Sequence, residues 1–341
     1  MFGSIFESLY NKVFVNIVVD GAKSRAYIEM SSAKAPFEKI KSSTNIFETA
    51  TLTPKLLDFI ESYTKETPYF YISFLDNSLS QGALPACKKE DLSKYADLTL
   101  SKHRCVDEQW SCYTLAADFD AMRRRYEAMG VDFVFSPFAL LSDFFKDKIK
   151  SNFAMYVLVQ TSSLSLAVFE NGKLLFAEHL DMHHMIEEDR LSGDDLDESF
   201  DLDDEIDLEG VNVDEDDLSI IDDFSDIEDL DSIEDIDEFA QHRDVEEELL
   251  NAIEEQDDEE EEVGFNEDYQ RFTLIQSSIA TYYKDARFES NFIENLYVAD
   301  SVGVSSELKK YLEEEMFLSV YVRKIDLAME LCDMAKMELK A

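Results

Sequence analysis

The first candidate for chemistry is a short polar turn that follows an apolar run. Val13–Val19 is rich in β-branched residues and ends in Asp20-Gly21, and Lys23 and Ser24 come next. A carboxylate, a glycine and a lysine within four residues are compatible with a phosphate-binding loop, because turn amides and a cation can both face an anion. The same residues also form an ordinary hairpin turn, and the residues alone favour that interpretation.

Other catalytic patterns are weaker. The chain has no Gly-x-Ser-x-Gly elbow, no Walker loop and no His-Glu-x-x-His helix. His179 and His183 are four residues apart and His184 adjoins an acidic run, which makes a divalent-metal site conceivable. Surface histidines at the exit of a strand are the favoured interpretation, and no bound metal is expected.

The elements that must position these residues are clearest in the second half. Periodicity and turn signals predict strands at 153–160, 164–169 and 173–180, a helix at 269–283, a strand at 295–299, a helix beginning at Ser305, a strand at 318–322 and a helix at 326–339. Three antiparallel strands followed by right-handed βαβ crossovers predict a five-stranded mixed sheet with helices on both faces.

The first half begins and ends in a similar way. It is expected to contain strands at 13–19, 25–30, 69–75, 110–115 and 133–135, a helix opened by Thr53-Pro54, a helix from Asp118 to Met129 and a helix from Ser136-Pro137 through Phe145. Two related α/β halves are typical of a duplicated ribonuclease-H-like unit. Ser151–Phe169 is long enough to cross a bilayer, but its polar residues and the Asn171-Gly172 turn favour two strands.

The charge of the chain is strongly negative and unevenly distributed. The formal net charge is -45, and residues 186–263 hold 39 acidic and 2 basic residues. Such a balance argues against nucleic-acid binding and against an anionic membrane surface. The four cysteines form no Cys-x-x-Cys pair and are too few for a disulfide framework, so reduced thiols of a cytosolic protein are expected. No secretory signal peptide is expected either.

The acidic segment at 186–263 is predicted to be disordered in the isolated protein, because so many carboxylates cannot be desolvated together. Apolar residues recur within it at a spacing of three: Phe224, Ile227, Leu230, Ile233, Ile236 and Phe239. Alternation of acidic and apolar residues is typical of segments that dock on basic, apolar-lined partners. A solvated linker is the alternative interpretation.

Two stretches resemble a known superfamily. VFVNIVVDGAKSRAYI (13–28) and MYVLVQTSSLSLAVFENGKLLF (155–176) are similar to the two phosphate-loop hairpins of actin-like ATPases. Within that superfamily, residues 109–141 and 292–316 resemble segments of the cytoplasmic actin-like domains of GspL and PilM, from type II secretion and type IV pilus systems. The resemblance implies an actin-like first lobe at 1–150, with a small subdomain inserted at about 53–117. It implies a second lobe at 151–341, interrupted by 186–263.

The resemblance also implies three nucleotide loops, and this chain departs from them. The first loop keeps Asp20, Gly21 and Lys23. In the second, Gln160 stands where an acid is expected, no glycine follows, and Ser162 is the remaining polar candidate. The third keeps Gly303 but begins with Asp300, which would repel phosphates. Residual binding of ATP and Mg²⁺ at these residues is conceivable, whereas hydrolysis is not expected.

The function implied by the resemblance is that of a non-catalytic actin-like scaffold in the cytoplasm. It would be an assembly-platform component of a type II secretion, type IV pilus or DNA-uptake machine. Its partners would be the secretion or pilus ATPase or an inner-membrane assembly protein, and the contact with the membrane would be peripheral, through a partner. Two alternatives remain: an active actin-like ATPase or sugar kinase, and a polyanionic, chaperone-like protein that acts through residues 186–263.

Overall fold

The computed structural model describes residues 9–34, 36–182, 267–285, 287 and 291–340. The acidic segment at 186–263, its six apolar residues, His183 and His184 lie outside these ranges. The described parts on both sides of that segment belong to one compact unit.

The first sheet has the strand order β3-β2-β1-β4-β8. Its strands are β1 (Lys12–Asp20), β2 (Lys23–Ser31), β3 (Lys39–Phe47), β4 (Phe70–Leu75) and β8 (Phe133–Phe135). The first three strands are antiparallel, and β4 and β8 run parallel to β1. Strand β3 was not predicted, because only Phe47 of its nine residues is buried and its sequence is largely polar.

The second sheet repeats the first in order and direction. Its order is β11-β10-β9-β12-β13, with β9 (Phe153–Val159), β10 (Ser163–Glu170), β11 (Lys173–Asp181), β12 (Asn295–Asp300) and β13 (Ser319–Lys324). Strands β12 and β13 are parallel to β9, and β10 and β11 are antiparallel to their neighbours. The duplicated ribonuclease-H-like fold is therefore confirmed, including two strands in place of a membrane-spanning helix at 151–169.

Most predicted helices are present, and local capping explains where they begin. Helix α2 (Pro54–Thr64) starts where the Thr53 hydroxyl accepts a hydrogen bond from the Leu56 amide. The same device opens α5 (Pro137–Phe144) at Ser136, α9 (Ser306–Glu314) at Ser305 and α10 (Leu327–Glu338) at Asp326. A helix also spans 267–284, and its predicted apolar face of Phe272, Ile275, Ile279 and Tyr282 is buried. Short α6 (Lys146–Ile149) follows α5.

The helix predicted from Asp118 to Met129 is shorter and begins earlier. Helix α4 spans Ala116–Arg125, and its capping position is Leu115, which gives no side-chain hydrogen bond. Asp118 lies in the first turn instead and accepts a hydrogen bond from the Ser80 hydroxyl. The assignment of Asp118 as the capping residue was therefore wrong, because the carboxylate bonds a neighbouring loop rather than its own helix.

A small third sheet is inserted between β4 and α4. It has the order β5-β7-β6, with β5 (Gln81–Leu84), β6 (Ser101–Val106) and β7 (Trp110–Leu115), and the short helix α3 (Lys89–Leu92) lies between β5 and β6. We call residues 81–115 the inserted sheet. It is narrower than the predicted range of 53–117, because α2 and β4 pack with the first large sheet.

The inserted sheet corrects the prediction of four reduced thiols. Cys87 and Cys105 form a disulfide, whereas Cys112 and Cys332 are free. Cysteine spacing could not show this pairing, because β6 approaches the loop before α3 only after the sheet has formed.

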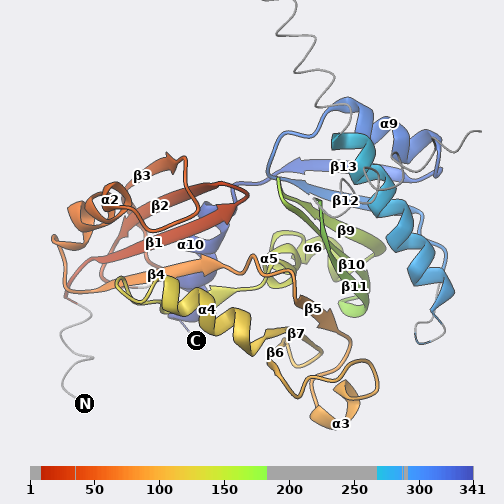
Figure 1. Cartoon of the computed structure of the whole chain (residues 1–341), viewed down its shortest axis with the longest axis horizontal. Coiled ribbons are helices and arrows are strands. Elements are labelled where there is room, and N and C mark those ends of the chain that lie inside the picture. Colours follow the sequence, from red (N-terminus) through yellow and green to blue (C-terminus); the bar gives the residue numbers. More distant parts are fainter. Residues whose placement is uncertain (1–8, 35, 183–266, 286, 288–290, 341) are drawn as a thin grey trace, which may run out of the picture. The chain divides into compact units, whose positions relative to one another are not determined.

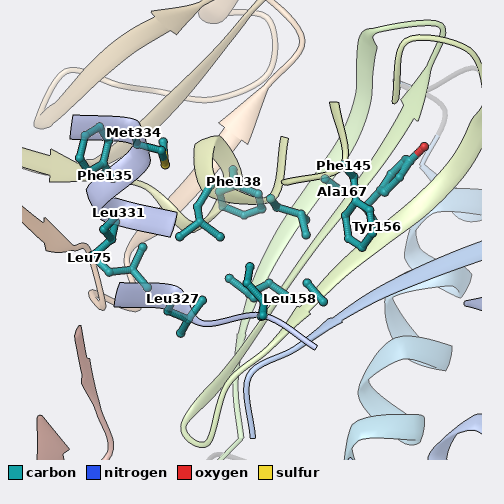
Figure 2. Packing of buried hydrophobic residues seen from close by; sticks show 14 of the residues in the cluster. Leu75, Phe135, Phe138, Phe145, Tyr156, Leu158, Ala167, Leu327, Leu331 and Met334 are labelled. Carbon is teal, nitrogen blue, oxygen red and sulfur yellow. The ribbon is translucent and has the colours of Figure 1, made fainter. Parts of the chain in front are cut away.

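One apolar core joins the two large sheets. It contains Phe14 and Leu75 from the first sheet, Tyr156 and Leu158 from the second, and Leu331 from α10. Figure 2 shows Leu75, Leu327 and Leu331 on one side of Phe138. Leu158 lies on the other side of that ring. Figure 1 shows α10 against the first sheet, although it follows β13 in the sequence. This last helix therefore completes the covering of the first sheet.

Candidate functional site: the loop pair at Asp20 and Ser162

The first loop is the turn between β1 and β2. Asp20 pairs with Lys23 across the turn, and Gly21 has a φ of 58°, in the left-handed region that favours glycine. A Cβ at Gly21 would lie 3.9 Å from the Thr161 Cγ2 atom, so this turn lies directly beside the second loop. The local geometry is the hairpin turn that the sequence favoured.

The Asp20 carboxylate spans the gap between the two turns. Its Oδ2 atom accepts a hydrogen bond of 2.7 Å from the Thr161 amide. Its Oδ1 atom accepts bonds of 2.9 Å from the Ser162 amide and 2.8 Å from the Ser162 hydroxyl. We call these three bonds the Asp20 clasp. They give both carboxylate oxygens a hydrogen-bond donor and join the first sheet's hairpin to the second's.

Lys23 does not take part in the clasp. Its ammonium lies 3.3 Å from a Glu48 carboxylate oxygen, and both side chains are largely exposed. A solvent-exposed ion pair of this kind contributes little to stability, typically below about 1 kcal/mol. The structure therefore places one predicted site residue, Lys23, away from the Ser162 loop.

The third loop follows β12 and is closed by its own carboxylate. The Asp300 Oδ1 atom accepts hydrogen bonds from the amides of Val302, Gly303 and Val304, at 3.0, 2.7 and 3.1 Å. Asp300 is buried, and Gly303 has a φ of 91°. The Ser301 hydroxyl donates to the Val159 carbonyl at 2.7 Å, which ties this loop to the end of β9. The amide of Gly303 is thus already bonded within its own loop.

These contacts test the fit of a magnesium nucleotide at the predicted residues. Phosphate groups bind to such loops through main-chain amides. Here the amides of Thr161 and Ser162 face Asp20, and the amide of Gly303 faces Asp300. A phosphate at these amides would have to displace the two carboxylates, Asp20 and Asp300, to which they are bonded.

A second feature was not predicted: a cavity of about 480 Å³ between the inserted sheet and the first lobe. We call it the insert cavity. Its lining includes basic, acidic and apolar groups: Lys102, His103, Arg104, Cys112, Tyr113, Phe119, Arg123, Asp76 and Asp132. The run Arg123-Arg124-Arg125, unusual in so acidic a chain, is a sequence signal that could have indicated this region, although none of the sequence-based predictions rests on it.

The charges around the insert cavity are partly paired. The Arg104 Nη2 atom donates to both carboxylate oxygens of Glu338 in α10, at 2.7 and 2.9 Å, and Lys102 pairs with Asp120. Burial raises the pKa of Asp76, although the amide and hydroxyl of Ser78 oppose this shift. Within the described residues Arg123 forms no ion pair, so its guanidinium remains open to a ligand at the cavity.

The fold and the loops define the class of this protein. Two ribonuclease-H-like sheets of equal topology, with their hairpin turns facing each other, form an actin-like ATPase fold. The chain belongs to the family described as domain of unknown function (DUF8341), whose model matches residues 155–340, more than half of the chain. A second model, domain of unknown function (DUF8569), matches residues 10–142. Among curated proteins, none matches this chain.

Solved structures with a similar arrangement are distant in sequence. A Bacteroides thetaiotaomicron protein with actin-like ATPase fold and unknown function has a TM-score of 0.49 and 10% identity, covering 98% of this chain and 99% of its own. PilM in the PilM-PilN type IV pilus biogenesis complex has a TM-score of 0.49 and 12% identity, and the match covers 96% of this chain and 97% of the other. The activator of the 2-hydroxyisocaproyl-CoA dehydratase from Clostridium difficile was solved with bound ADPNP. It has a TM-score of 0.42 and 12% identity, and the match covers 97% of this chain and 96% of the other.

Proposed function

We propose that this protein is a non-catalytic actin-like scaffold that acts through protein contacts. It would serve as a cytoplasmic platform component of a type II secretion, type IV pilus or DNA-uptake machine, peripheral to the inner membrane through a partner. The resemblance of residues 109–141 and 292–316 to segments of GspL-like and PilM-like domains supports the class of machine. None of the helices among the described residues has the length and apolar content needed to cross a bilayer.

The Asp20 clasp is the observation that carries the non-catalytic part of the proposal. An ATPase of this fold needs free amides for phosphate and a free carboxylate for Mg²⁺ or water. Asp20 and Ser162 satisfy each other instead, at 2.8 and 2.9 Å. The clasp would hold the two hairpins together without nucleotide, which suits a rigid platform.

The insert cavity supports a role in binding a partner. It combines the ring of Phe119 with charged groups of both signs, including Arg123. A pocket with an apolar wall and a few polar groups suits a short segment of an inner-membrane assembly protein. The acidic segment at 186–263 would bind a separate, basic partner such as the machine's ATPase.

Thermal unfolding with Mg-ATP tests the non-catalytic part. A ligand at 100 times its Kd stabilises the folded state by about 2.7 kcal/mol. We expect no shift in Tm at millimolar Mg-ATP, and a dose-dependent rise would contradict the proposal.

Binding of purified cytoplasmic segments of inner-membrane assembly proteins, measured by fluorescence anisotropy, tests the scaffold part. Arg123→Glu should abolish that binding, with Lys23→Glu as a charge-matched control away from the insert cavity.

A further inference from the structure

Strand β13 leaves one edge of the second sheet open. Within the described residues, no strand lies beyond it in the order β11-β10-β9-β12-β13. The Ser319 amide donates to the Glu294 carbonyl and the Ile325 amide donates to the Asp300 carbonyl, so the odd-numbered residues bond towards β12. Alternation along the strand then turns the main-chain groups of Val320, Val322 and Lys324 outwards. These groups form an unused ladder for another strand.

The other edges of the two large sheets differ from this one. Strand β3 carries Lys39 and Lys41 among serine and threonine, and its register with β2 shifts beside Met30 and Ser31. Strand β8 is only three residues long, and β5 packs beside β11. Charges, bulges, short strands and covering segments are the usual means of blocking an edge. Strand β13 has a regular register, no proline, and the sequence Val320-Tyr321-Val322 at its centre.

A row of tyrosines leads to the open edge. Tyr156, Tyr297 and Tyr321 occupy the same register position on β9, β12 and β13. The rings of Tyr156 and Tyr297 are stacked with centroids 5.2 Å apart, and those of Tyr297 and Tyr321 with centroids 4.9 Å apart. Exposure rises along the row, from 0% for Tyr156 to 51% for Tyr321. The row therefore ends in a half-exposed ring that has no stacking neighbour beyond it among the described residues.

Opposite charges lie before β13 and at its end, so two antiparallel copies of the strand are complementary in charge. Glu313, Glu314 and Glu315 precede the strand, and Arg323 and Lys324 end it. All five side chains are exposed. Glu313 pairs with Lys309 at 3.6 Å and the Arg323 guanidinium lies 4.4 Å from the centre of the Phe144 ring, whereas neither Arg323 nor Lys324 forms an ion pair within the described residues. An antiparallel copy of the strand would bring the basic end of each chain towards the acidic end of the other. Opposite charges at both ends favour one two-fold arrangement.

We propose that β13 pairs with β13 of a second copy of this chain, antiparallel and about a two-fold axis near Tyr321. Val320 of each copy then faces Val322 of the other, and these residues exchange main-chain hydrogen bonds. The Tyr321 rings meet at the axis, so the tyrosine row continues from one sheet into the next. The two second sheets become one ten-stranded sheet. This inference does not depend on the proposed function.

Sedimentation analysis of the full chain tests the pairing. We choose about 0.15 M salt because it screens repulsion between the acidic segments beyond about 8 Å. We expect a concentration-dependent dimer. Tyr321→Ser should weaken the dimer about tenfold or more. Ile46→Ser is the matched control, since Ile46 is 57% exposed on β3, an edge strand of the first sheet. Val322→Pro removes only an outward amide and should also give monomers.

A charge exchange gives the sharper test. The pair Arg323→Glu/Lys324→Glu and the pair Glu314→Lys/Glu315→Lys should each give monomers. An equimolar mixture of these two variants should recover a heterodimer, because each basic end again meets an acidic one. A wild-type chain that stays monomeric at every concentration would overturn the proposal. So would a dimer that survives both Tyr321→Ser and Val322→Pro, since its interface would lie elsewhere.

Discussion

The Asp20 carboxylate receives both the amide and the hydroxyl of Ser162, through bonds of 2.9 and 2.8 Å to one oxygen atom. These two residues lie 142 positions apart in the chain and in different sheets. Their contact places an anion of the protein at the turn where a bound phosphate would be expected. The two hairpins therefore hold each other by internal bonds rather than through a shared ligand.

Removal of the Asp20 carboxylate should destabilise the protein. Asp20→Ala leaves the Thr161 and Ser162 amides without their acceptor, and bonds to charged groups contribute about 1.5–3 kcal/mol each when buried. Because Thr161 is exposed, water replaces part of the lost hydrogen bonding. We expect the free energy of unfolding, measured with urea, to fall by roughly 2–3 kcal/mol. Asp20→Asn keeps one acceptor oxygen and should lose less. Equal stability of Asp20→Ala and wild type would show that the clasp is absent in solution.

The buried pair of Glu29 and Lys336 makes a second prediction. The two groups lie 2.6 Å apart between β2 and α10. Burial acts to raise the pKa of Glu29, but hydrogen bonds from Lys336, Ser31 and Tyr27 outweigh it and lower the pKa below its usual value. Lys336→Met removes the cation beside the buried Glu29 carboxylate, so we expect the free energy of unfolding to fall by about 3–5 kcal/mol at pH 7.

That loss should depend on pH in a defined direction. A carboxylate with a lowered folded-state pKa stabilises the fold above its unfolded pKa, and this contribution is lost as pH falls through the folded value. The gap between wild type and Lys336→Met should therefore shrink below about pH 4.5. Unfolding curves across that range measure it. The double variant Glu29→Gln/Lys336→Met should recover most of the stability at pH 7, and a gap that widens in acid would refute the role of this pair.

His179 is largely buried rather than the surface histidine that the sequence favoured, and it predicts a loss of stability in acid. Its Nδ1 atom lies 2.8 Å from the Ser165 hydroxyl oxygen, and burial lowers the pKa of the imidazole to about 4. The unfolded chain binds a proton below about pH 6.5 while the folded chain does not, so stability falls between about pH 6.5 and 4. The full effect is at most about 3 kcal/mol. His179→Gln should flatten this slope, as urea unfolding at several pH values will show; an unchanged slope would assign it to other groups.

The disulfide gives a prediction for the inserted sheet alone. Cys87 and Cys105 are separated by 18 residues, and closing a loop of that size stabilises by about 3 kcal/mol in the chain-entropy account. Cys87→Ser/Cys105→Ser should therefore speed amide exchange in β5, β6 and β7 but not in β9 or β12. Alkylation of the denatured wild type without reductant, followed by mass spectrometry, should label two thiols rather than four. Four labelled thiols would restore the interpretation of reduced cysteines.

The large sheets could be predicted from sequence because their strands carry strong local signals. Apolar runs next to the turn signals Asp20-Gly21 and Asn171-Gly172 predict the β1–β2 and β10–β11 hairpins. Strand β3 could not be predicted, since an exposed edge strand needs neither apolar alternation nor a buried face. Its pairing with β2 is visible only when the sheet exists.

The candidate site was predicted in part for a similar reason. The turn pattern identified Asp20 and Gly21 as loop residues, the resemblance to actin-like ATPases added Ser162, and the structure brings the three together. That Asp20 accepts the Ser162 amide depends on two hairpins in separate sheets, a relationship that no local pattern encodes. The insert cavity and the Cys87–Cys105 disulfide depend in the same way on contacts made after the chain has folded.

Helix α10 has a consequence for how the chain acquires its structure during synthesis. The first sheet is complete in sequence at Phe135, yet the helix that covers one of its faces begins at Leu327. At about 5–20 residues per second, the ribosome needs roughly 10–40 s to make the residues between them. During that time the apolar side chains of β1 that α10 later covers, Phe14 among them, stay open to other molecules. The nascent chain thus passes through a long aggregation-prone interval, in which a chaperone would find its binding surface on the first sheet.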